Sequence, residues 1–158
     1  MTAMLKGMFN EAGAQGAMLL DDAEEISNAS AVDDVWNVLT RRLKPLGFDR
    51  LLYGLTQFRS DRSFGSPDDL MVLSSHDDAY TKRFVGDGLF FHAPMAQWTR
   101  EHTGACSWGW VEQRQGQLSP QELKVVEFNQ KMNVCAGYTI SFPSESRRAK
   151  AALSLTAR

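Results

Sequence analysis

Two alternating segments near the end of the chain constrain its fold more than any other feature of the sequence. In AALSLTA (151–157) the leucines alternate with Ser154 and Thr156, and in GYTISF (137–142) the aromatic residues and the isoleucine share one side. Successive side chains of a strand point to opposite faces of a sheet, so both segments are predicted to be β-strands. The polar segment SESRRAK between them is predicted to be a hairpin loop, which makes the two strands antiparallel neighbours.

Helical and strand patterns alternate along the rest of the chain. Apolar residues recur at steps of three and four across 32–43, which predicts an amphipathic helix that Pro45 and Gly47 bring to an end. RLLYGLTQF (50–58) and LMVLSS (70–75) are predicted strands. The order is helix, two strands, two or three helices and two strands. It favours an antiparallel sheet with helices packed on its faces, an α+β sandwich.

Short polar motifs mark where helices are expected to begin. Carboxylates suit helix starts because they accept hydrogen bonds from the free N–H groups of the first turn. Three acidic pairs are expected there: Asp21-Asp22, Asp33-Asp34 and Asp77-Asp78. Pro94 is expected to begin a further helix, and the capping box SPQE at 119–122 predicts a helix through about Met132.

Size, charge and cysteine usage limit the class of protein. The chain has 158 residues, 43% of them hydrophobic, and a net charge of −2, which indicates one domain and argues against binding a nucleic-acid backbone by itself. Asn10 and Glu11 interrupt the apolar residues of 1–20, so this segment is predicted to be an N-terminal helix or arm and not a signal peptide. Cys106 and Cys135 are expected to be reduced thiols, which favours a cytoplasmic protein.

Residues 90–110, FFHAPMAQWTREHTGACSWGW, raise the question of catalysis. Cys106 with His92 or His102 would be the components of a nucleophilic pair. The favoured interpretation is that Cys106 is a small buried residue beside Trp108 and that His102 ends a helix. A zinc site from His76, His92, His102 and a cysteine is disfavoured because their spacings are loose. No catalytic residue, metal or cofactor is therefore predicted, and Arg147, Arg148 and Lys150 are interpreted as a solvated hairpin tip.

Large aromatic residues gather in the same part of the chain, and they suggest the wall of an apolar pocket. The set comprises Tyr80, Phe84, Phe90, Phe91, Trp98, Trp108 and Trp110. An apolar cavity with a few polar groups is the usual form of a small-molecule site. Plain core packing is the alternative explanation for about half of these rings.

The spacing of these residues resembles the autoinducer-binding domain of LuxR-type quorum-sensing regulators. In that family a W-x-x-x-Y helix leads to Asp-Pro and then to a Trp. Here Tyr80-Thr-Lys-Arg-Phe84 stands at the helix motif, Ala93-Pro94 follows nine residues after Phe84, and Trp108 follows fifteen residues after Ala93.

Further segments fall in the same order, so the resemblance covers about residues 30–158. The first strand with its preceding GF turn, the strand that begins at Gly137, and Ala152-Leu153-Ser154-Leu155-Thr156 each match a family stretch. The resemblance implies an α/β/α sandwich of the GAF/PAS-like kind, with a twisted, mostly antiparallel sheet of about five strands. An acyl-homoserine lactone would be enclosed between sheet and helices.

The resemblance also implies which residues form the site. In typical members the helix Trp donates to the lactone carbonyl, the Asp accepts from the amide N–H, and a Tyr and a Ser or Thr hold the acyl carbonyl. Trp108 and Ser154 are kept here, Tyr80 replaces the donor Trp, Phe84 replaces the helix Tyr, and His76 replaces the other Tyr. Alternation adds three strand positions on one face: Leu52, Gly54 and Thr56.

The largest departure from the family is Ala93, which stands at the position of the Asp. A buried amide N–H without an acceptor costs about 1–3 kcal/mol. The usual ligand would need His92, His76 or a water as the acceptor, so a divergent signal molecule is an alternative to an ordinary acyl-homoserine lactone.

The expected function is non-enzymatic signal sensing by a homodimer. In the family a helix-turn-helix domain follows the sensor domain, so DNA is expected to be bound only through a C-terminal domain that is not in this chain. The chain is then either a part of a regulator or a protein that naturally lacks that domain and inhibits full-length relatives. The alternative function is a ligand-independent, GAF/PAS-like interaction module whose cavity is filled by its own side chains.

Overall fold

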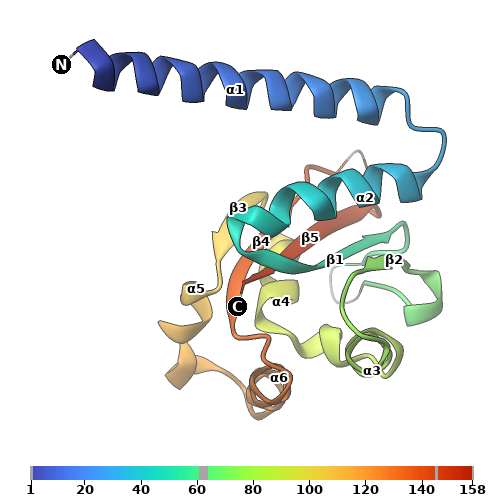
Figure 1. Ribbon diagram of the computed structural model, residues 1–158. Coiled ribbons are helices and arrows are strands. Elements are labelled where there is room, and N and C mark those ends of the chain that lie inside the picture. Colours follow the sequence, from blue (N-terminus) through green and yellow to red (C-terminus); the bar gives the residue numbers. More distant parts are fainter. Residues whose placement is uncertain (1, 61–63, 145, 158) are drawn as a thin grey trace. The chain divides into compact units, whose positions relative to one another are not determined.

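The computed structural model describes residues 2–60, 64–144 and 146–157, and the side chains from residue 13 onward within these ranges except that of residue 15. Figure 1 shows the chain from its N-terminal helix to its last strand. The contacts within the chain divide it into two units, Met1–Arg42 and Leu43–Arg158. Among the described residues, no helix is both long enough and apolar enough to cross a bilayer.

The first unit contains helix α1 (Thr2–Ser27) and all of helix α2 (Val32–Leu43) except its last residue. Arg42 Nε lies 2.5 Å from Asp22 Oδ1, so an ion pair joins the two helices. The expected helix start at Asp21-Asp22 is wrong, because both residues lie inside α1. The start of α2 agrees with its acidic residues, since Oδ2 of Asp34 accepts from the backbone N–H groups just before the helix.

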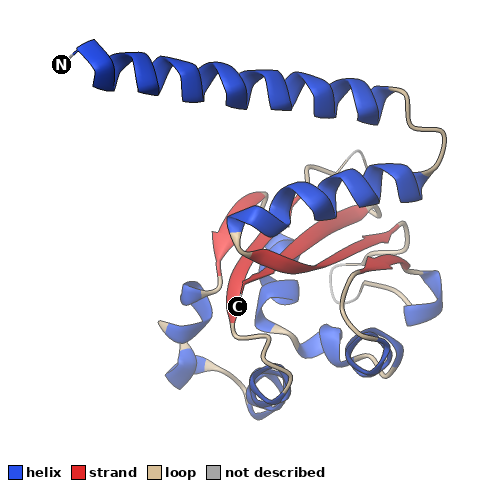
Figure 2. Cartoon of the chain, viewed as in Figure 1, coloured by secondary structure: helices blue, strands red, loops and turns tan. Residues whose placement is uncertain are grey.

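The second unit contains a five-stranded sheet in the order β2-β1-β5-β4-β3, and every neighbouring pair is antiparallel (Figure 2). The strands are β1 (Phe48–Thr56), β2 (Met71–Ser74), β3 (Gly104–Ser107), β4 (Ala136–Ser141) and β5 (Lys150–Ala157). The predicted antiparallel pairing of the last two strands and the α+β class are confirmed. The strand pattern of the sequence did not predict β3.

Close backbone contact between β4 and β5 requires a glycine at position 137. A Cβ added to Gly137 would lie 2.0 Å from the carbonyl oxygen of Leu155 on the neighbouring strand. Such a distance is far inside van der Waals contact, so any side chain at position 137 would push the two strands apart.

The short helices of the second unit are α3 (Asp78–Thr81), continued by a π-helical turn (Lys82–Gly86), then α4 (Pro94–Glu101), α5 (Gly109–Glu112) and α6 (Pro120–Lys131). Of these helices, α3, α4 and α6 begin where the sequence predicted, whereas α5 was not predicted. Asp77 caps α3 by accepting from the backbone N–H of Tyr80 at 2.7 Å. The capping box of α6 is confirmed, because Ser119 and Glu122 exchange side chain to backbone hydrogen bonds. Single 3-10 turns lie at Lys44–Leu46, Pro67–Asp69, Leu89–His92 and Gln115–Gln117.

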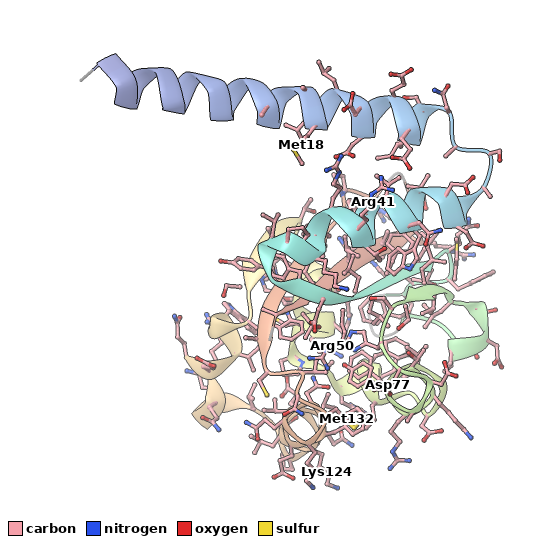
Figure 3. The ribbon with its side chains drawn as sticks, in the orientation of Figure 1. Met18, Arg41, Arg50, Asp77, Lys124 and Met132 are labelled. Carbon is pink, nitrogen blue, oxygen red and sulfur yellow. The ribbon has the colours of Figure 1, made fainter. Side chains whose placement is uncertain are left out.

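The helices α3, α4 and α6 lie on the same side of the sheet (Figure 1). The hydrophobic core on that side joins Phe64, Tyr80, Phe84, Phe90 and Val125. Arg50 of β1 fastens α6 to the sheet, because its guanidinium donates to the carbonyl oxygens of Met132, at 3.1 Å, and Asn133 just after the helix (Figure 3). These hydrogen bonds link β1 to the end of α6.

Candidate ligand-binding cavity

A cavity of about 260 Å³ lies between the sheet and the helices of the second unit. Its volume is just below the range of about 300–1,000 Å³ that is usual for small-molecule sites. All nine residues that the sequence analysis selected line it: Leu52, Gly54, Thr56, His76, Tyr80, Phe84, Ala93, Trp108 and Ser154. The structure therefore brings together the whole predicted set, while the part of each residue in binding stays a prediction.

The sheet wall of the cavity follows from the two-residue alternation of β1 and β5. Leu52 pairs with Ser154, Gly54 with Ala152, and Thr56 with Lys150, so these residues share one face of the sheet. All six also line the cavity. The leucines of β5 point to the opposite face, as the sequence pattern predicted.

The helical wall is a stack of three rings spaced four residues apart. The ring of Tyr80 lies between those of His76, at a centroid distance of 4.3 Å, and Phe84, at 5.2 Å, and it also stacks on Phe128 at 5.5 Å. The hydroxyl of Tyr80 donates to Oδ1 of Asn129 at 3.1 Å. Burial raises the pKa of Tyr80, so the phenol stays protonated. Its one proton is already donated, and Tyr80 presents an aromatic ring and an acceptor oxygen to a ligand.

His76 brings to this stack a buried ring nitrogen that has no hydrogen-bond partner among the described residues. Its side chain is only 8% exposed, and Nδ1 is buried without a hydrogen-bond partner in the described part of the chain. Burial, with the nearby charge of Arg50, lowers the pKa of His76 to about 4. The imidazole is therefore neutral near pH 7, with one N–H donor and one acceptor nitrogen.

Trp108 is held to the sheet by a short chain of hydrogen bonds. Its indole N–H donates to Oγ1 of Thr139 at 2.9 Å, and that oxygen lies 3.3 Å from Oγ of Ser154. Thr139 is 2% exposed, so this chain is screened from water. These hydrogen bonds fix the plane of the indole ring, and the hydroxyl of Ser154 remains a polar group in the cavity wall.

Ala93 is buried at 5% exposure and directly precedes α4, where no side chain caps the helix. It contributes only a methyl group to the cavity. Of the two histidines considered as substitute acceptors, His92 is exposed and lies outside the cavity lining, whereas His76 is part of that lining. Of these two histidines, only His76 has a place in the cavity wall.

Lys150 lines the cavity, although the sequence predicted it to be part of a solvated hairpin tip. The predicted solvated tip holds for Arg147 and Arg148, which are exposed, but Lys150 is only 6% exposed and lines the cavity. Its ammonium donates to the carbonyl oxygens of His102, at 3.2 Å, and Phe142, at 3.1 Å. The signal was present in the sequence, because alternation along the last strand places Lys150 on the face of Ser154.

Cys106 and His102, which were considered for catalysis, contact different residues. Cys106 is partly exposed, which corrects the expectation of a buried thiol, and its Sγ contacts the carbonyl of Ser107 at 3.5 Å. Burial raises the pKa of this thiol, which disfavours the thiolate form. His102 ends α4 as predicted, where its ring stacks on Trp98 and its Nδ1 lies 2.9 Å from the carbonyl oxygen of Trp98. Within the described ranges, no three His, Cys, Asp or Glu side chains gather around a possible metal position.

The family of the chain follows from a comparison with protein-family models. The model described as the autoinducer binding domain matches residues 31–158, the range over which the resemblance was expected. The chain belongs to the autoinducer-binding domain family of LuxR-type regulators. It is thus the ligand-sensing domain of such a regulator. A search of curated protein sequences finds no match.

Solved structures agree with this fold. The chain is similar to CepR2 of Burkholderia cenocepacia, an N-acylhomoserine lactone dependent LuxR family transcription factor. The TM-score is 0.66 at 14% identity over 89% of this chain and 77% of that one. Two structures of SdiA from Escherichia coli are also similar. The crystal structure has a TM-score of 0.64 at 13% identity over 92% of this chain and 55% of that one. The solution structure of its residues 1–171 has a TM-score of 0.58 at 14% identity, over 94% and 78%.

Proposed function

We propose that the cavity binds an acyl-homoserine lactone or a divergent relative of it, as the signal that this regulator domain senses. The observation that carries the proposal is that the nine residues selected from family spacing and strand alternation all line one mainly apolar cavity. Burying the apolar chain of such a ligand would contribute about 25 cal/mol for each Å² removed from water. Few polar groups are then needed to orient the head of the ligand.

Two polar groups of the wall are suited to an amide and a carbonyl. The hydroxyl of Ser154 is held by the chain from Trp108 through Thr139, and it can donate to a carbonyl oxygen of the ligand. The neutral ring of His76 can accept the amide N–H that an aspartate would otherwise take. A neutral acceptor forms a weaker hydrogen bond than a carboxylate. This favours a signal that differs from the ordinary lactone near its amide.

We also propose several properties of the regulator as a whole. Such a regulator would be cytoplasmic and without enzymatic activity, would pair as a homodimer, and would reach DNA through a further domain. The likeness to transcription factors and the partly exposed, poorly activated thiol of Cys106 support this view.

The proposal can be tested by binding measurements with a matched pair of tryptophan variants. Isothermal titration calorimetry with N-acyl homoserine lactones of several chain lengths should show binding to the wild-type protein and none to Trp108→Ala. Trp110→Ala is the control, because Trp110 lies outside the cavity lining and packs under the guanidinium of Arg114 at 4.3 Å. If the Trp108→Ala variant bound the lactones as tightly as the wild-type protein, Trp108 would not be part of the binding site.

A second measurement separates ligand sensing from the ligand-independent alternative. Mass spectrometry of extracts from the purified protein should detect a small molecule with an acyl chain. If no molecule is extracted and no lactone raises the melting temperature, the domain is an interaction module and the proposal fails.

A further inference from the structure

Lys150 places a buried positive charge at one end of the cavity. It is the first residue of β5 and pairs with Thr56 at the end of β1. Only 6% of its surface is exposed, and it lines the cavity. Two of its three N–H bonds are donated to the carbonyl oxygens of His102 and Phe142. One donor therefore remains for a further partner.

No acidic side chain of the described residues forms an ion pair with Lys150. The ion pairs among these residues involve Arg41, Arg42, Arg50 and Arg83. The charged neighbour of Lys150 is instead Arg59, and burial together with this second cation lowers the pKa of Lys150. Burying an ammonium group without an anion is unfavourable, so a bound anion would relieve a cost that the protein alone leaves in place.

The spacing along β5 gives the cavity two polar ends. Ser154 and Lys150 lie on the same face and are four residues apart, which corresponds to about 13 Å at about 3.3 Å per residue. Between them the sheet wall offers only the small residues Ala152 and Gly54. Phe64, whose carbonyl oxygen accepts from the hydroxyl of Thr56 at 2.8 Å, also lines the cavity. A ligand that fills this length would meet a polar head site, an apolar middle and a cation.

We infer that the cavity takes an acyl compound whose chain ends in a carboxylate, and that the ammonium of Lys150 binds this carboxylate. The inference rests on the proposed function for the head of the ligand and adds the chemistry of its other end. The carboxylate can belong to a free fatty acid or to a signal with a carboxylated acyl tail. An amphiphile with a plain alkyl tail would leave the remaining N–H of Lys150 without a partner.

The first experiment compares octanoate with 1-octanol, which have the same chain length but differ in charge. Calorimetry with the wild-type protein should give at least tenfold tighter binding of octanoate. In Lys150→Met, which has a side chain of similar length without the charge, octanoate should lose this advantage while 1-octanol binds as before. Lys150→Arg should keep most of the preference. Equal affinities of the two probes for the wild-type protein would overturn the inference, and so would a preference that survives in Lys150→Met.

The second experiment distinguishes this inference from the proposed function. Two N-acyl homoserine lactones of equal chain length, one with a plain tail and one with a terminal carboxylate, are titrated into the same proteins. Tighter wild-type binding of the carboxylated lactone, lost in Lys150→Met, is the expected result for a carboxylated signal. Binding of neither lactone, with octanoate still dependent on Lys150, would point to a fatty acid and contradict the proposed function alone. Tight binding of the plain lactone with rejection of both carboxylates would contradict the inference and leave the proposed function intact.

The comparison remains decisive if removal of the lysine harms folding. Lys150 also ties the end of α4 to the strand β4 through its two carbonyl partners, so Lys150→Met is expected to melt at a lower temperature. The preference of the unmodified protein for octanoate over 1-octanol does not depend on any variant. Arg148→Met, at an exposed position outside the cavity lining, is the matched control, and it should leave this preference unchanged.

Discussion

The indole N–H of Trp108 donates to Oγ1 of Thr139 across 2.9 Å, which joins the loop before α5 to the fourth strand of the sheet. The backbone N–H of Trp108 donates to the carbonyl oxygen of Gly137 in the same strand, at 3.0 Å. Two hydrogen bonds thus set the position of one ring in the cavity wall. Trp108 is therefore a structural link between the cavity wall and the sheet.

Replacing Thr139 by valine should break the link between Trp108 and the sheet. The change keeps the shape of the side chain but leaves the indole N–H without its acceptor. Loss of a buried hydrogen bond of this kind costs about 1–3 kcal/mol. Urea denaturation should show this loss of unfolding free energy, and the affinity for the ligand should fall as well. Ser154→Ala, at the end of the same chain, should reduce affinity with a smaller change in stability; a larger loss of stability than in Thr139→Val would contradict this order.

The titration of His76 should make stability depend on pH. The pKa of about 4 in the folded protein lies below the ordinary 6.5, so between these values the unfolded chain binds a proton that the folded chain does not. The contribution of the neutral His76 to the free energy of unfolding is complete above pH 6.5 and is lost as the pH falls toward 4. By pH 5 the loss should reach about 2 kcal/mol.

Denaturation of the wild-type protein and of His76→Phe at pH 7 and pH 5 measures this contribution. Phenylalanine keeps an aromatic ring to stack on Tyr80 but does not titrate. The drop in unfolding free energy between the two pH values should be smaller by about 2 kcal/mol in the variant. His92→Gln, at an exposed position, should behave as the wild-type protein. Identical drops in His76→Phe and the wild-type protein would mean that His76 is freely protonated in the folded state.

Ala93→Asp should strengthen the binding of an ordinary acyl-homoserine lactone. A carboxylate there would supply the acceptor for the amide N–H, which corresponds to about tenfold to a hundredfold in affinity. The same carboxylate precedes α4 and could instead cap its first turn, which would raise stability without changing affinity. Calorimetry with the lactone measures the effect of the new acceptor, and melting curves of the unliganded variant measure the effect of the cap, so the two readouts separate the two effects. Unchanged affinity in Ala93→Asp would show that other residues determine the selectivity.

Gly137→Ala should destabilise the sheet, whereas Gly54→Ala should not. An added methyl group at position 137 would lie 2.0 Å from the carbonyl oxygen of Leu155, but at position 54 no atom lies within 4 Å. Overpacking of this kind typically costs about 1–3 kcal/mol. Chemical denaturation of the two variants tests the difference. Gly54 also lines the cavity, so its alanine variant should change affinity for the ligand more than stability.

The sequence predicted those parts of the fold whose signals are local. The capping box at Ser119 and the alternation in β5 act over a few residues, and both are present as expected. The strand β3 was missed because GACS contains no β-branched or aromatic residue, and its extended form depends on pairing with β4. The Asp21-Asp22 pair looked like a helix start, but Asp22 forms an ion pair with Arg42, a partner distant in the sequence.

The candidate site was predicted from family spacing and strand alternation together, and its residues do surround one cavity. The hydrogen-bond partners of the individual polar atoms could not be predicted from the sequence. Neither the donation of the Tyr80 hydroxyl to Asn129 nor the lack of a partner for Nδ1 of His76 follows from residue types. Lys150 was misjudged because its neighbours in the loop are charged and exposed, although its position in the strand turns it inward.

The central place of β5 in the sheet has a consequence for how such a cavity adapts. Hydrogen bonds to β1 and β4 on both sides hold this strand, so it cannot shift without breaking two ladders at once. The opposite wall is built from a single α-helical turn, a π-helical turn and a 3-10 turn, which are much less cooperative. In hydrogen-exchange measurements the amides of β5 should therefore be the slow ones and those of residues 78–92 the fast ones. Binding of a ligand would then change the conformation of residues 78–92 and leave that of β5 unchanged.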